Sequence, residues 1–377
     1  MDFTFTEEQQ AAVEAAKAVF SGVTPDAVPS PALTPGAVAE DLDRPLWSRL
    51  AAADLLGLAL ATEHGGAGLD PVALCLVLRE SARVLARVPL LETSAVALTI
   101  DRYALPHVSA ELLPRVTRGE LVLTVAAHGR TGHESADHAV SARREGADWI
   151  LDGLHTAVPW AHGADIIAVP ACSGDGRTLL ALVPRAQEGL VLSDQYSTSG
   201  ELLAQLRLDA VRLDATRIID ADGAWERLHA ILTTGTCALA LGLGEAVLTM
   251  TSQYTGKREQ FGHPVATFQA VAVQTADRYI DLRAMEATLW QAAWRITHEA
   301  NGRLPAAGDI AVAKIWASEG VRRVVQTAQH LHGGFGADTD YPLHRYHAWA
   351  KHLELSLGPA AAHEEALGDL LASHPLG

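Results

Sequence analysis

An uncharged, apolar stretch at residues 230–244 restricts the fold of this chain more than any other feature. Apolar side chains continue around nearly every face of the predicted helix as far as residue 254. A helix without a polar face must lie inside a bundle or against another subunit. Because the uncharged stretch is shorter than the roughly 20 residues that cross a bilayer, it predicts a buried bundle helix and no membrane insertion.

The periodicity of the chain changes twice, which predicts an α+β fold in three parts. Helical periodicity, opened by a capping box at Thr6 and Gln9, covers residues 6–20, 46–56, 71–85 and 95–116, the last interrupted near Pro106 and Pro114. Short runs rich in branched side chains then predict antiparallel strands at residues 121–125, 149–153, 165–169, 178–183 and 206–212. Helical periodicity returns from residue 224. The predicted domains are an N-terminal helical domain (1–118), a middle antiparallel β domain (119–224) and a C-terminal four-helix bundle (225–377).

The composition of the chain excludes several classes of protein. It has 377 residues, 49% of them hydrophobic, and a formal net charge of -16. An acidic surface repels phosphate backbones, so nucleic acid is not a predicted partner. The three cysteines, Cys75, Cys172 and Cys237, lack metal-ligand spacing, and no metal site is predicted. The N-terminus has no basic segment followed by an apolar run, so we expect no signal peptide and a cytoplasmic location.

Two motifs in the C-terminal half carry a family resemblance. The first reads Arg-x-Gln-Phe-Gly-x-Pro from Arg258 to Pro264 and continues as Phe-Gln-Ala from Phe268. The second, at residues 328–336, ends in Gly-Gly-Phe-Gly, and Tyr-Pro-Leu follows from Tyr341. Taken alone, a basic residue at 258 suits either the end of a helix or a phosphate. Together and in this order, the motifs resemble those of the acyl-CoA dehydrogenase family, and the resemblance extends over the whole chain.

The resemblance implies a cofactor and the residues that hold it. Members of this family dehydrogenate acyl-CoA thioesters with FAD. Their Arg and Gly-Gly-x-Gly loop hold the pyrophosphate and adenine half of a flavin that is bound mainly by the neighbouring subunit. His330 stands where the family usually has Gln. The cofactor-binding residues implied in this chain are Arg258, Gln260, Phe261, Phe268, Gln269, His330, Gly333, Gly334 and Gly336.

The proton acceptor of the family is missing from both of its usual positions. In the family a Glu takes the α-proton while the β-hydrogen leaves as hydride to the flavin. By its spacing from the second motif, the usual Glu falls on Leu357, and the alternative base position falls on Leu232. Neither leucine accepts a proton. Glu354, about one helical turn before Leu357, is the fallback base; Glu354 and Glu226 are both predicted on a solvated face.

The residues that contact the flavin ring in the family are also replaced. Residues 124–131 stand in place of a Thr-x-Pro-x-Ala-Gly-Ser-Asp run, and residues 157–160 replace a Trp-Ile-Thr/Ser motif. The losses coincide with that of the base, whereas the Arg258 motif is kept. This combination favours a chain that completes the flavin site of a different subunit. Residues 344–358 resemble bacterial heterotetrameric acyl-CoA dehydrogenases of steroid side-chain degradation, which implies an acyl-CoA substrate and a second dehydrogenase subunit as partners.

Two alternative functions stay open on the sequence alone. One is a homo-oligomeric flavoenzyme of the same fold that uses Glu354, Glu226 or no base. The other is a non-catalytic acyl-CoA-binding protein that has lost the flavin. A hydrolase is not predicted, because the chain has no Gly-x-Ser-x-Gly nucleophile elbow.

Overall fold

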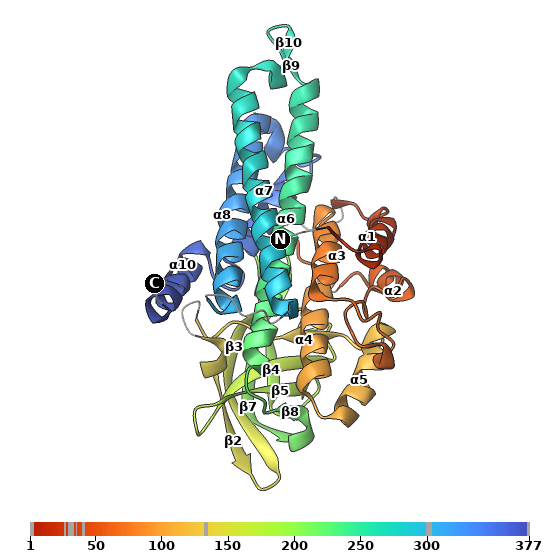
Figure 1. Ribbon diagram of the computed structural model, residues 1–377, viewed down its shortest axis with the longest axis vertical. Helices are drawn as coiled ribbons and strands as arrows, with labels where there is room; N and C mark the ends of the chain where they lie inside the picture. Colours follow the sequence, from red (N-terminus) through yellow and green to blue (C-terminus); the bar gives the residue numbers. More distant parts are fainter. Residues whose placement is uncertain are drawn as a thin grey trace.

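The computed structural model describes residues 4–25, 28, 34, 36–39, 42–131, 135–298 and 304–374. A β-sheet lies at the lower end in Figure 1, and the long C-terminal helices extend away from it. The N-terminal helices cover one side of these long helices, and the last helix lies on the opposite side. The order of helices, then strands, then helices follows the prediction from periodicity.

The helices predicted near the N-terminus are present, with revised bounds. The Thr6 hydroxyl accepts from the Gln9 amide (3.2 Å) and the Gln9 side chain accepts from the Thr6 amide (3.0 Å), so the capping box is confirmed. The interruption predicted near Pro106 in residues 95–116 is confirmed, because Pro106 disfavours a helical conformation at Leu105. The interruption predicted near Pro114 is wrong, because Pro114 lies inside the second of the two helices. The elements are α1 (Glu7–Phe20), α2 (Arg44–Ala52), η2 (Thr62–His64), α3 (Pro71–Arg83), α4 (Leu90–Tyr103) and α5 (Pro106–Thr117).

The middle of the chain forms one mixed sheet, with strand order β6-β7-β3-β2-β4-β5-β8 and β1 paired to β4. The prediction of a purely antiparallel region is wrong, because β4 pairs in parallel with both β1 and β2. Three strands of this sheet, β2, β6 and β8, were not predicted. The elements are β1 (Leu123–Val125), η3 (Ala136–His138), β2 (Val140–Glu145), β3 (Asp148–Pro159), β4 (Ile166–Ser173), β5 (Thr178–Pro184), β6 (Leu190–Tyr196), β7 (Leu202–Asp214), η4 (Ala215–Arg217) and β8 (Ile218–Ile219).

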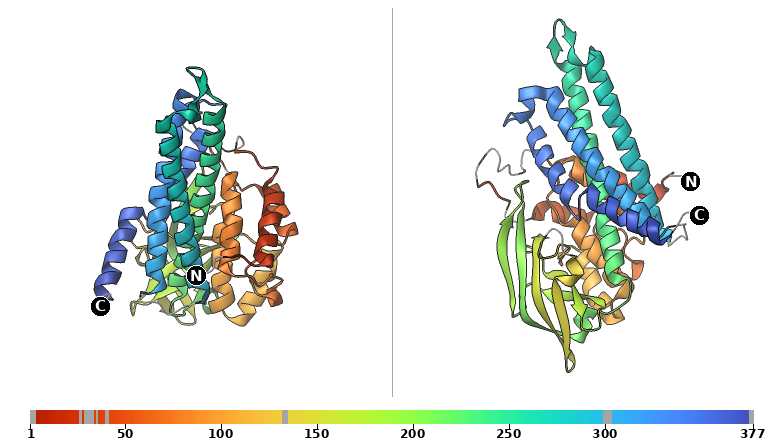
Figure 2. Two further views of the ribbon diagram at one scale, coloured as in Figure 1. Left: turned by 45° about the horizontal axis from the view of Figure 1, so that its top comes forward. Right: turned by 90° about the vertical axis from the view of Figure 1, so that its left-hand side faces the viewer.

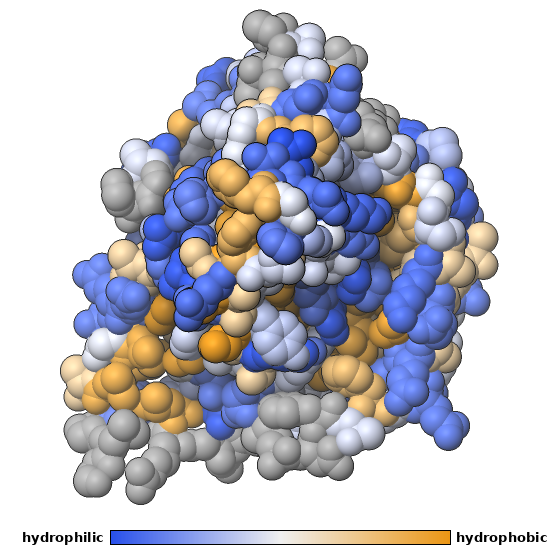
Figure 3. Space-filling view, turned by 90° about the horizontal axis from the view of Figure 1, so that it is seen from above, coloured by the Kyte–Doolittle hydropathy of each residue, from blue (hydrophilic) through white to orange (hydrophobic). Residues whose placement is uncertain are grey.

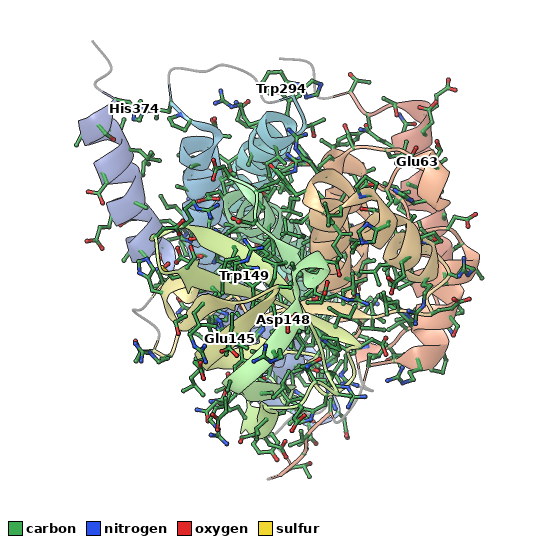
Figure 4. All side chains as sticks on the ribbon, turned by 90° about the horizontal axis from the view of Figure 1, so that it is seen from below. Glu63, Glu145, Asp148, Trp149, Trp294 and His374 are labelled. Carbon is green, nitrogen blue, oxygen red and sulfur yellow. The ribbon has the colours of Figure 1, made fainter. Side chains whose placement is uncertain are left out.

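The β2–β3 hairpin ends in a group of charged side chains. Glu145 and Asp148 lie near one another when the molecule is seen from below (Figure 4). Arg212 of β7 forms ion pairs with both, at 2.5 Å from Glu145 and 3.0 Å from Asp148. These exposed pairs fasten the hairpin to β7 and contribute little to stability.

The C-terminal part contains three long helices and two shorter ones among the described residues, rather than four equivalent helices. A small hairpin joins α6 to α7 at the end farthest from the sheet (Figures 1 and 2). The elements are α6 (Ala224–Lys257), β9 (Glu259–Gln260), β10 (His263–Pro264), η5 (Val265–Thr267), α7 (Gln269–His298), α8 (Ala306–His332), η6 (Gly333–Ala337), α9 (Leu343–Leu355) and α10 (Ala360–Ser373).

Helix α6 is the apolar helix on which the fold prediction rests. It is long and apolar enough to cross a membrane by length and composition, but 78% of its most apolar window is buried inside the protein. It packs against α3, α4, α7, α8 and α9. Its apolar surface is therefore covered mainly by helices of its own chain.

A single hydrophobic cluster joins the N-terminal helices to the C-terminal bundle. It includes Leu50 of α2, Leu78 of α3, Leu241 of α6 and Val321 of α8, each at most 1% exposed. In β4, Ile166 and Ala168 belong to this cluster, whereas the alternating residues at 167 and 169 belong to a second cluster within the sheet. The helical parts therefore share a core, and the predicted domain boundaries at 118/119 and 224/225 stay predictions.

Candidate functional site

The predicted phosphate-binding arginine lies at the hairpin end of α6. Arg258 follows the last helical residue; its backbone amide donates to Tyr254 O (2.8 Å) and its carbonyl accepts from the Val265 amide (2.7 Å). The hairpin turns through two positive φ angles, 55° at Phe261 and 78° at Gly262. Arg258 is exposed, and the described part of the chain gives its side chain no ion-pair or hydrogen-bond partner. Its guanidinium is available to an external anion.

An aromatic stack brings the two sequence motifs together. Tyr254, one helical turn before Arg258, stacks on His332 (ring centroids 4.4 Å apart) and on Phe335 (5.2 Å). His332 Nε2 and the Tyr341 hydroxyl are 2.9 Å apart, and burial lowers the pKa of His332. The glycine-rich η6 is thereby held beside the end of α6. Sequence analysis did not assign Tyr254 or His332 a structural role, although aromatic residues flank both motifs.

The glycines of η6 leave open backbone on its outer side. Gly333 has φ 60° and ψ −140°, which favours glycine, and a Cβ on Gly333 or Gly334 would meet no described atom within 4 Å. Gly336 faces inward, where a Cβ would lie 2.9 Å from the amide nitrogen of Gln329. That amide also donates to Gly333 O (3.0 Å). A bare, exposed backbone beside an exposed arginine fits the phosphate-bearing half of a dinucleotide.

The remaining predicted cofactor residues lie at the same end of the molecule. Phe261 is 91% exposed and meets Phe268 edge to face, with ring centroids 6.3 Å apart. Viewed from above, this end shows apolar residues among polar ones (Figure 3). Gln260, Gln269 and His330 are exposed as well. The structure thus gathers the nine predicted positions at one end of the molecule, and their role in cofactor binding stays a prediction.

The two leucines at the family's base positions line one cavity at the other end of α6. Leu232 and Leu357 share it with Val125 from β1, Trp160 after β3 and Leu91 from α4. Its volume is about 120 Å³. Ligand pockets generally measure about 300–1,000 Å³, so the cavity is too small for a flavin ring together with an acyl group.

The replaced ring-binding segments form the wall that closes this cavity. Thr124 is fully buried, and its hydroxyl donates to Pro159 O (2.7 Å). Ala157 and Trp160 adopt positive φ angles of 52° and 56°, and the side chain of Gln195 accepts from the Ala157 amide (2.7 Å). Left-handed backbone at residues other than glycine costs about 1–2 kcal/mol each. The surrounding contacts therefore impose this shape on the wall.

Glu354 does not lie where the sequence predicts, and it does not reach the cavity. Its side chain is 14% exposed and pairs with Lys351 (2.6 Å), so the predicted solvated face is wrong for Glu354. It is not among the described residues that line the cavity. The buried Lys314 donates instead to the backbone carbonyls of Leu353 (3.2 Å) and Glu354 (3.1 Å), which stabilises the end of α9. Glu226 is exposed, as predicted.

Sequence analysis missed four titratable residues that line the cavity: Glu92, His128, Glu201, which pairs with Arg87 (2.7 Å), and His352. Burial raises the pKa of Glu92 to about 7, despite a hydrogen bond from Trp160. Burial also lowers the pKa of His352 to about 4 and, with His155 nearby, lowers that of His128. Glu92 is the one carboxylate in the buried run 90–100 of α4, which was a readable sequence signal.

The two ends of α6 are too far apart to serve one flavin within this chain. Arg258 follows Leu232 by 26 residues along a continuous helix. At 1.5 Å per residue this separates them by about 39 Å. A group held by Arg258 therefore extends away from this chain's own cavity.

Comparison with known proteins agrees with these motifs. The family models of the acyl-CoA dehydrogenase N-terminal and C-terminal domains match residues 6–120 and 232–371. The acyl-CoA dehydrogenase FadE27 of Mycobacterium tuberculosis is 34% identical over 338 residues, which cover 88% of this chain and 89% of that protein. The chain belongs to the acyl-CoA dehydrogenase family.

Two solved structures of this family share the fold over nearly the whole chain. The ChsE4-ChsE5 complex from Mycobacterium tuberculosis contains a chain 33% identical, with a TM-score of 0.90 and full coverage of both chains. A variant of the Tcur3481-Tcur3483 steroid ACAD contains a chain 37% identical, with a TM-score of 0.89 and coverage of 97% and 98%. This acyl-CoA dehydrogenase chain therefore resembles subunits of two-chain complexes.

FAD is the cofactor of acyl-CoA dehydrogenases. A glutaryl-CoA dehydrogenase of Mycobacterium smegmatis, which shares the fold with a TM-score of 0.86, was solved in complex with FADH2. The exposed Arg258 and the open backbone at Gly333 and Gly334 fit the phosphate half of this cofactor. The closed cavity between Leu232 and Leu357 does not fit its ring half.

We expect Glu92→Gln to stabilise this acyl-CoA dehydrogenase chain at high pH but not at low pH. Because burial raises the Glu92 pKa from 4.5 to about 7, the folded state keeps a proton that the unfolded state has lost. Wild-type stability should fall as pH rises through this window, by at most about 3 kcal/mol, and glutamine removes that dependence. Urea unfolding at about pH 5 and about pH 8 measures the difference. The exposed Glu364→Gln serves as the control, and equal differences at both pH values would contradict the assignment.

Proposed function

We propose that this chain is the subunit without the catalytic base in a hetero-oligomeric, FAD-dependent acyl-CoA dehydrogenase of the cytoplasm. The observation that carries the proposal is the separation of about 39 Å between Arg258 and the closed cavity along α6. The end that fits flavin phosphates is exposed, whereas the predicted position of the ring and base is a cavity of only about 120 Å³ lined by this chain's own side chains. A second dehydrogenase chain therefore supplies the ring-binding pocket and the base.

Within such a complex, the residues of this chain bind and orient the cofactor. Arg258 offers a planar fork of donors, which grips a pyrophosphate oxygen pair more firmly than a neutral group does. Gly333 and Gly334 allow the ligand to approach the backbone, and Phe261 and Phe268 cover its apolar surface. FAD, when bound, supplies the hydride acceptor for the β-hydrogen of the acyl-CoA. Since Leu232 and Leu357 cannot accept the α-proton, the partner must carry that carboxylate.

The similar complexes support a class of partner and of substrate. Both solved structures named above contain two kinds of chain, and one of them is described as a steroid dehydrogenase. We infer that the partner of this chain is a second acyl-CoA dehydrogenase that keeps its base. We also infer that the substrate is the CoA thioester of a steroid side chain. The acidic net charge of -16 means that local cations, rather than the overall field, meet the anionic CoA.

The test is co-expression with a second acyl-CoA dehydrogenase chain that keeps its base, followed by counting flavin and measuring dye reduction. We expect one FAD per pair of unlike chains, and Glu354→Gln should keep activity within about threefold, because Glu354 pairs with Lys351 outside the cavity. Glu364→Gln on α10 is the matched control. A fall of several orders of magnitude in the Glu354 variant would place the base on this chain. A yellow homo-oligomer, or a colourless chain that binds acyl-CoA alone, would favour the alternative functions.

A further inference from the structure

The cavity beside Leu232 and Leu357 retains the features of a small-molecule site. Its walls come from N-terminal helices, the sheet and the C-terminal bundle, so it lies where the three parts of the chain meet. At about 120 Å³ it is close to the roughly 150 Å³ of a dry, apolar cavity that holds benzene. The inference rests on the proposed function, in which the partner subunit binds the flavin ring and leaves this cavity free of it.

Besides Glu201, which pairs with Arg87, three titratable side chains on different elements line this cavity. Glu92 comes from α4, His128 follows β1, and His352 comes from α9. All three keep some accessible surface. Their pKa values nevertheless shift in the direction that burial dictates, to about 7 for Glu92 and to about 4 for His352. All three side chains line the cavity, and burial is the largest cause of each pKa shift.

The wall is consequently apolar but able to form hydrogen bonds. Burial favours the uncharged forms of Glu92, whose pKa rises to about 7, and of His352, whose pKa falls to about 4, and it also lowers the pKa of His128. Glu201 is already paired with Arg87 (2.7 Å), so a charged ligand would meet no unpaired counter-charge there and would lose its hydration. A neutral molecule with one polar group would satisfy a wall donor or acceptor and bury its apolar body against Leu232 and Leu357.

We propose that this cavity binds a small neutral molecule of about six to eight non-hydrogen atoms, with an apolar ring or short chain and one hydrogen-bonding group. In this proposal Glu92, on the part of the cavity wall that α4 forms, makes the hydrogen bond to the polar group of the ligand. The leucines that replaced the family's bases supply the apolar contacts. A position that holds a flavin ring in other acyl-CoA dehydrogenases thereby becomes a binding site without a redox group.

The proposal is tested by ¹⁹F NMR titration of the purified full chain with fluorobenzene and 4-fluorophenol. We expect saturable binding of both, with Kd values of roughly 0.1–1 mM for ligands of this size. The phenol should bind about three- to tenfold more tightly, since it adds one hydrogen bond. No saturation for either probe up to its solubility limit would overturn the proposal.

Two variants locate the binding. Glu92→Leu should abolish the advantage of the phenol while fluorobenzene binding stays within about twofold, and Glu63→Leu, whose carboxylate is 79% exposed, should change neither. Leu232→Phe should weaken both probes by at least about tenfold, because it fills the cavity. If Leu232→Phe fails to fold, the Glu92 result decides alone. A phenol advantage that survives Glu92→Leu would place the polar contact elsewhere and overturn the proposal.

Discussion

Leu241→Asp is expected to yield no folded protein. Leu241 lies in the middle of α6 with 0% of its surface exposed, within the cluster that joins the N-terminal helices to the bundle. An aspartate there buries a charge with no partner, at a cost of several kcal/mol. The free energy of unfolding of a protein is typically only about 5–15 kcal/mol, so this cost approaches the total stability. Circular dichroism and gel filtration of the expressed protein measure the loss.

Leu105→Asp is the matched control, because Leu105 is 48% exposed at the start of α5. The same substitution at this surface position should leave the fold intact. A folded Leu241→Asp protein of native oligomeric mass would contradict the burial of α6 within its own chain. Loss of assembly with retention of the monomer fold would move Leu241 to a subunit interface.

Arg258→Ala is expected to strip flavin from the complex without unfolding this chain. Arg258 is exposed and has no side-chain partner among the described residues, so its removal leaves none of them unpaired. A charge-assisted, bidentate contact to phosphate contributes about 1.5–3 kcal/mol, which corresponds to about a tenfold to hundredfold loss of FAD affinity. Flavin absorbance per complex after gel filtration gives the result.

Lys257→Ala removes one positive charge from the neighbouring position. It tests whether flavin binding depends on the geometry of the Arg258 guanidinium or only on the local positive charge. Both residues are exposed at the end of α6. If the fork of Arg258 grips the phosphates, Lys257→Ala should retain most of the flavin, and Arg258→Lys should behave more like Arg258→Ala. Unchanged flavin content in Arg258→Ala would refute the assignment.

The sequence alone determined the family and the cofactor class. The Arg258 motif and the Gly333–Gly336 loop are local, because each ligand contact comes from a few consecutive residues and needs a particular side chain or a bare backbone. The family models and FadE27 confirm the membership that these motifs predicted. Spacing from the motifs also predicts that the family's base positions fall on Leu232 and Leu357, and this assignment stays a prediction. The roles of the cofactor residues and the domain boundaries stay predictions.

Only the tertiary structure decided what the two leucines do. They are far apart in the chain, and they share a cavity because α6 and the turn after α9 meet the sheet and α4 at one place. Packing there buries Glu92 and closes the space around Trp160, which no local pattern predicted. It also moved Glu354 off the solvated face that helical periodicity implied. Local periodicity specifies which faces of an element are apolar. The packing of elements that are distant in the chain decides where a cavity lies and which ionisable groups are buried in their uncharged form.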